Sequence, residues 1–101
     1  MDIHPIAKLI VQKGVRSANL SMFSEVQRQE ILGQAAETLM RLNRYNEAID
    51  AMELGNLPLP VDQLKKIAEN KILFEQYQEA YELLVKAKQH EMAEFVKTNF
   101  L

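Results

Sequence analysis

The chain of 101 residues contains no cysteine, so disulfides, thiolate metal sites and cysteine nucleophiles are excluded. Long apolar runs are missing as well, since uninterrupted apolar stretches extend for only a few residues, far short of the roughly 20 that a membrane helix needs. The first residues lack the basic start and apolar run of a secretory signal peptide. These absences predict a soluble, cytoplasmic protein with no membrane insertion.

Blocks of like charge are also missing. Twelve Lys and Arg and fourteen Asp and Glu are mixed along the sequence and give a formal net charge of −2. A protein that binds DNA or RNA normally presents a clustered basic surface that neutralises phosphates. The sequence therefore predicts no nucleic-acid partner.

Residues that usually carry chemistry are few and scattered. His4 and His90 lie far apart in the sequence, and neither belongs to a metal-binding or catalytic motif. Asp2, Ile3 and His4 could chelate copper only if Met1 were removed. The three glycines are isolated, so no glycine-rich phosphate loop is present. We expect no metal, no cofactor and no enzymatic activity, with both histidines either solvated or capping helices.

Glycine and proline are scarce, and they mark the ends of helical segments. Gly14 and Gly55 each follow an apolar segment, where glycine can adopt the left-handed conformation that closes a last turn. Pro58 and Pro60 suit the start of the next helix. Apolar residues recur at steps of three and four, and the period-two alternation of strands is absent. The pattern predicts an all-α fold with six helices at about 5–13, 24–42, 45–54, 60–74, 77–87 and 89–99.

Two local features refine this assignment. Ser24 and Gln27 fit a capping box, in which each side chain bonds to the other residue's backbone amide. Segment 15–23 combines polar loop residues with Leu20, Met22 and Phe23, which are suited to packing. Its conformation therefore stays open.

An internal repeat appears when the chain is compared with itself at an offset of 32 residues. Periods of this size are typical of stacked helical hairpins. The small alanines in the matched set would let two antiparallel helices approach closely within each hairpin. The identical pairs within the two hairpins are Leu32 and Leu64, Ala36 and Ala68, Glu37 and Glu69, Tyr45 and Tyr77, Glu47 and Glu79, and Ala48 and Ala80.

Residues 44–49 (Arg-Tyr-Asn-Glu-Ala-Ile) and 76–81 (Gln-Tyr-Gln-Glu-Ala-Tyr) resemble the turn and second-helix start of a tetratricopeptide repeat. The resemblance covers about residues 29–88. It departs from the family at Leu32 and Leu64, which replace the usual tryptophan, and in a period two residues shorter than the usual 34. A related helical-hairpin solenoid, of the kind used in vesicle-coat proteins, is the alternative.

The resemblance implies a right-handed stack of antiparallel helix hairpins, with about two repeats plus capping helices. Terminal repeats need caps because the open ends of the core must be closed. Within a single domain, the expected parts are an N-terminal cap helix and loop at 1–23, hairpins at 24–56 and 57–88, and a C-terminal cap helix at 89–101.

By this resemblance, the protein is a non-catalytic adaptor that binds a protein or peptide on the concave face formed by the first helix of each hairpin. Family members that hold a partner's carboxylate use Lys, Arg and Asn there, whereas Glu37 and Glu69 would repel it. A basic or mixed-charge partner is therefore favoured, and a merely solvated charged face is the alternative. The predicted binding residues are Glu30, Gly33, Glu37, Arg41, Asp62, Lys65, Glu69 and Leu73.

The alternative function is a structural protein that self-associates into a homo-oligomer. Phe95, Val96, Phe100 and Leu101 would then offer apolar surface to another copy of the chain, with Phe95, Phe100 and Leu101 as the residues predicted for the contact. The competing interpretation is ordinary packing, with Met92, Phe95 and Val96 facing the stack.

Overall fold

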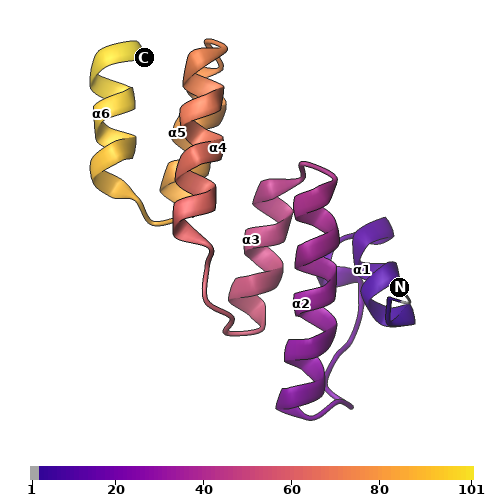
Figure 1. Cartoon of the computed structure of the whole chain (residues 1–101). Helices are drawn as coiled ribbons and strands as arrows, with labels where there is room; N and C mark the ends of the chain where they lie inside the picture. Colours follow the sequence, from indigo (N-terminus) through magenta and orange to yellow (C-terminus); the bar gives the residue numbers. More distant parts are fainter. Residues whose placement is uncertain (1–2) are drawn as a thin grey trace. The chain divides into compact units, whose positions relative to one another are not determined.

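A computed structural model describes residues 3–101 of the chain, with Ser17 described by its backbone alone. These residues form six α-helices and one short 3₁₀-helix, and they contain no strand (Figure 1). The all-α prediction is confirmed, and each predicted helix end lies within one residue of the observed one. The elements are α1 (Pro5–Lys13), η1 (Val15–Ser17), α2 (Glu25–Arg41), α3 (Tyr45–Leu54), α4 (Val61–Leu73), α5 (Tyr77–Lys86) and α6 (His90–Phe100).

The chain divides into two compact units, Met1–Leu59 and Pro60–Leu101. In the first unit, α2 packs against both α1 and α3. In the second unit, α5 packs against both α4 and α6. Each unit is therefore built around a middle helix with a neighbour on either side. None of the helices within residues 3–101 combines the length and the apolar character that crossing a membrane requires.

The buried side chains of residues 3–101 are all apolar. α2 is the longest helix and buries the most residues, among them Ile31, Leu32 and Leu39. Complete burial of one such side chain contributes roughly 1.5–3 kcal/mol to stability. The alanines expected to allow close helix contact are all buried, namely Ala36, Ala48, Ala68 and Ala80.

Four helices end in the same backbone turn, with a left-handed residue just after the helix. These residues are Asn43 (φ 61°), Asn56 (φ 54°), Glu75 (φ 62°) and Lys88 (φ 62°). At each turn, the next amide bonds back to a carbonyl five residues earlier, as in the bond from Arg44 to Leu39 at 2.9 Å. This is the Schellman motif, which satisfies carbonyls that a helix end leaves without partners.

Gly55 does not adopt the left-handed conformation expected of it. Its φ is −88°, and the left-handed position falls on Asn56 instead. A Cβ at Gly55 would lie 3.2 Å from Leu32 Cδ1 and 3.3 Å from Leu32 Cβ. A Cβ at this position would therefore be tightly packed, and Leu32 would have to shift by a few tenths of an ångström to accommodate it. Gly14 does have a positive φ, of 109°, at the end of α1.

The capping box at the start of α2 is confirmed. Ser24 Oγ accepts a hydrogen bond from the Gln27 amide at 3.2 Å, and the Ser24 amide donates to Gln27 Oε1 at 2.9 Å. Segment 15–23, whose conformation the sequence does not predict, begins with η1 and then buries Leu20 in the core of the first unit. Phe23 packs against that core, whereas Met22 is 81% exposed.

His4 caps α1, which is one of the two roles expected for it. Its Nδ1 accepts a hydrogen bond from the Ile6 amide at 3.0 Å. Its own amide donates to Gln34 Oε1 at 2.7 Å, so the start of α1 is tied to the middle of α2. The copper-binding prediction involves Met1 and Asp2, which lie outside the described residues.

Candidate interaction surfaces

The predicted binding residues of α2 form a stripe along its surface. Glu30, Glu37 and Arg41 are exposed, and Gly33 is half-buried. Steps of three and four residues place them on neighbouring turns of one side of the helix. Their surface position agrees with the prediction, and their role in binding stays a prediction.

The segment that follows α3 crosses α2 beside this stripe. A Cβ at Gly33 would lie 3.7 Å from Leu57 Cδ1, which is ordinary contact. One turn earlier, Gln29 Nε2 donates to the Gly55 carbonyl at 3.0 Å. Chain 55–57 is therefore fixed to α2, and it forms one edge of the stripe near Gly33.

The predicted residues of α4 form a second stripe, on the other unit. Asp62, Glu69 and Leu73 are exposed, and Lys65 is half-buried. Asp62 lies in the first turn of α4, where the helix dipole favours negative charge. The structure thus brings together the residues within each stripe, and the two stripes belong to separate compact units.

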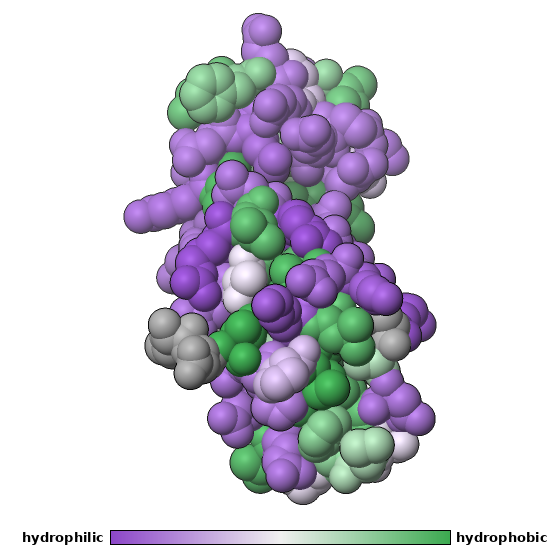
Figure 2. Space-filling view, turned by 90° about the vertical axis from the view of Figure 1, so that its right-hand side faces the viewer, coloured by the Kyte–Doolittle hydropathy of each residue, from purple (hydrophilic) through white to green (hydrophobic). Residues whose placement is uncertain are grey.

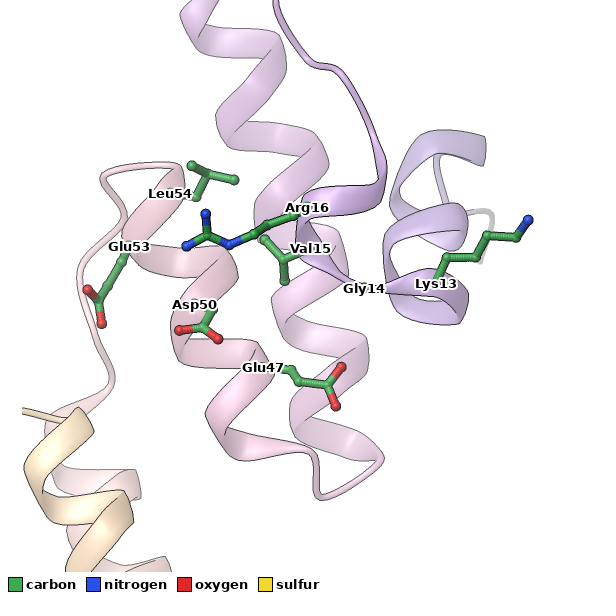
Figure 3. Close-up of a pocket in the computed structure, with 8 residues that line it drawn as sticks. All are labelled: Lys13, Gly14, Val15, Arg16, Glu47, Asp50, Glu53 and Leu54. Atoms are coloured by element: carbon green, nitrogen blue, oxygen red, sulfur yellow. The ribbon is translucent and has the colours of Figure 1, made fainter.

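A cleft of about 800 Å³ lies in the first unit, between the end of α1 with η1 and the exposed side of α3 (Figure 3). One wall carries Arg16, and the other carries carboxylates at three-residue steps along α3; the Lys13 side chain extends away from α3. Figure 3 shows Arg16 extending toward α3. The lining residues are Lys13, Gly14, Val15, Arg16, Glu47, Asp50, Glu53 and Leu54.

Charges of both signs on facing walls suit the cleft to a segment that itself carries both signs. No residue of this cleft was among the predicted binding residues. The regular spacing of Glu47, Asp50 and Glu53 was the available signal, but it is equally typical of a solvated helix face.

Arg44, in the turn between α2 and α3, binds to both α1 and α3, and no feature of the sequence indicated this role. Its Nη1 donates to the Val11 carbonyl, near the end of α1, at 2.9 Å. Its Nε donates to Glu47 Oε1 at 3.1 Å, and its Nη2 forms an ion pair with Glu47 Oε2. The hydrogen bond to Glu47 raises the pKa of Arg44 above its ordinary value, although desolvation acts in the opposite direction. Arg44 therefore fixes α1 to the start of α3, beside the cleft.

Aromatic rings gather at one end of the second unit. Phe100 stacks on Tyr77 with ring centroids 4.6 Å apart and an interplanar angle of 7°. Phe95 meets Phe100 edge-on at 6.2 Å. Val96 is buried, which agrees with packing on the stack and contradicts the expectation that it offers exposed apolar surface. Phe95 is 60% exposed, so the expectation that it faces the stack is wrong. Phe95, Phe100 and Leu101, the residues predicted for self-association, are all exposed.

Within residues 3–101, no three side chains of the types that bind metals, namely His, Cys, Asp and Glu, gather around one point. His90 is the first residue of α6 and is exposed. No family model matches the chain, and comparisons with curated proteins and with solved structures found no match either. The resemblance to tetratricopeptide repeats therefore rests on the residues quoted for it.

Proposed function

We propose that the chain is a non-catalytic interaction module that binds a basic or mixed-charge segment of a partner protein along the exposed stripes of α2 and α4. In this proposal, the hairpins stack as in tetratricopeptide-like solenoids, and the stripes line the concave face of the stack. The module works in the cytoplasm without metal or cofactor.

The observation that carries the proposal is the repetition of one exposed acid. Glu37 and Glu69 are separated by the repeat offset, and both are exposed. Each follows directly on a buried alanine of the repeat, Ala36 or Ala68. The two hairpins therefore place a carboxylate at the same position relative to their cores, where it would attract a basic partner.

The test starts from a peptide display library screened against the full chain. We expect selected peptides to be enriched in Lys and Arg. Glu37→Lys and Glu69→Lys should each weaken their binding by about 2- to 5-fold, since a charge at the edge of an interface is worth up to about 1 kcal/mol. Fluorescence polarisation measures the affinity, and the loss should shrink as salt is added.

Glu94→Lys is the matched control, because it makes the same charge change at an exposed position of α6. An equal loss in this variant would mean that only net charge matters, and the stripes would be excluded. Glu53→Lys examines the cleft instead. If it weakens binding while Glu37→Lys does not, the partner lies in the cleft and the proposed site is wrong.

A further inference from the structure

The turn from α4 to α5 and the end of α6 lie at the same end of the second unit (Figure 1), and large apolar side chains are exposed there. Leu73 and Phe74 are each 77% exposed, so neither is held by packing within the unit. Green apolar side chains are visible among purple hydrophilic ones on the face shown in Figure 2. We name this surface the aromatic end. It consists of Leu73, Phe74, Tyr77, Phe95, Phe100 and Leu101.

The aromatic end is large enough to form the centre of a protein interface. A phenylalanine side chain presents roughly 150–250 Å², so at the observed exposed fractions the five members other than Tyr77 together offer on the order of 600 Å². The largest apolar patch of a typical monomer measures about 300–600 Å². One side of a standard interface buries about 800 Å². This surface could therefore supply most of one side of a stable dimer.

Charges of both signs accompany this surface. Glu75 lies in the turn just before Tyr77, Lys97 lies one helical turn before Phe100, and Glu94 directly precedes Phe95. All three charged side chains are exposed. A partner surface charged with one sign would meet repulsion either at Lys97 or at the two acids. A second copy, rotated by a two-fold axis through the stacked Tyr77 and Phe100 rings, presents Lys97 to Glu75 and Glu75 to Lys97.

We propose that the aromatic end is the interface of a symmetric homodimer, in which each copy covers the exposed rings of the other and Glu75 faces Lys97 twice. In such an interface the same patch is used on both copies, so the assembly closes at two. The proposal goes beyond peptide binding, because it requires none of the α2 residues and shares only Leu73 with the α4 stripe.

Sedimentation equilibrium of the full chain from about 1 µM to about 1 mM, a range that covers weak to moderate affinities, tests the association. We expect a reversible monomer–dimer equilibrium. Phe74→Glu and Phe95→Glu should each weaken dimerisation at least about tenfold, since each places a charge in an apolar centre. Met22→Glu is the control, because Met22 is 81% exposed but lies in the first unit. Circular dichroism verifies that every variant keeps its helices.

Charge reversal tests the two-fold arrangement. Glu75→Lys alone and Lys97→Glu alone should each weaken the dimer by placing like charges opposite one another. The double variant should recover most of the affinity, because the pairs are restored with their signs exchanged.

Three outcomes would overturn the proposal. They are a monomer over the whole concentration range, a dimer insensitive to both phenylalanine variants, and a series of growing oligomers in place of a closed pair. Peptide binding through Glu37 could persist in each case, so failure here is distinguishable from failure of the proposed function.

Discussion

Gly33, within α2, and Gly55, which packs against α2, have environments of opposite kind. Gly33 is inside the helix, where a methyl group would make only ordinary contact with Leu57. Gly55 is buried, and its backbone lies directly against Leu32. The first glycine can therefore be replaced, whereas the second is fixed by close packing.

We predict that Gly33→Ala raises the free energy of unfolding by about 0.5–1 kcal/mol, because alanine favours the helix over glycine. Gly55→Ala should lower it by about 1–3 kcal/mol, the usual effect of an overfilled core. Urea denaturation followed by circular dichroism measures both. If Gly55→Ala proved as stable as the natural chain, the close approach to Leu32 would be incorrect.

At the scale of elements, the four equivalent helix ends differ in the residue that takes the left-handed position. Two use asparagine, which tolerates this conformation, whereas Glu75 and Lys88 have no such preference. A residue other than glycine in this conformation is held there by the surrounding structure, at a cost of roughly 1–2 kcal/mol. At these two turns, the conformational preference of the residue is therefore unfavourable for the backbone conformation that it adopts.

Lys88→Gly should accordingly stabilise the protein by about 0.5–1 kcal/mol. Glycine removes the backbone strain at this position, and the greater conformational entropy that it loses on folding offsets part of this gain. Lys66→Gly makes the same change at an exposed position inside α4, where it should destabilise by about 1 kcal/mol. The two variants should thus move the midpoint of thermal unfolding in opposite directions. A shift of the same sign in both would contradict the assigned turn.

The same comparison explains how far the sequence could predict the structure. The helices follow from local signals, such as the spacing of Leu32 and Leu39 and the capping box at Ser24. The turn at Lys88 could not be predicted, because lysine carries no signal for a positive φ. The link from Arg44 to Val11 depends on where α1 comes to lie. The same holds for the cleft and for the aromatic end, since each joins side chains that are distant in the sequence.

At the scale of the whole molecule, the two units share one principle of construction. Each has a middle helix, α2 or α5, that packs against the helix on either side. The terminal helices α1 and α6 each contact one other α-helix, and they bury fewer residues than α2 and α5 do. Local stability should therefore fall from the middle of each unit outwards.

Native-state hydrogen exchange measures this order. We predict that the slowest amides of the first unit belong to α2 and those of the second unit to α5. Amides of α1 and α6 should exchange at least about tenfold faster, corresponding to openings that cost about 1.4 kcal/mol less. If the slowest amides belonged to α1 or α6, the predicted order of local stability within the units would be wrong.

No aromatic residue is among the buried residues of the described chain, and tryptophan is absent from the sequence. Ultraviolet absorption and emission therefore come from tyrosines at the periphery. One of these tyrosines, Tyr77, stacks on Phe100 and lies at the aromatic end. Tyrosine fluorescence would consequently report structural changes at the surface of the helices. A dye or a methyl NMR probe would be needed to follow the unpacking of the alanine- and leucine-rich core.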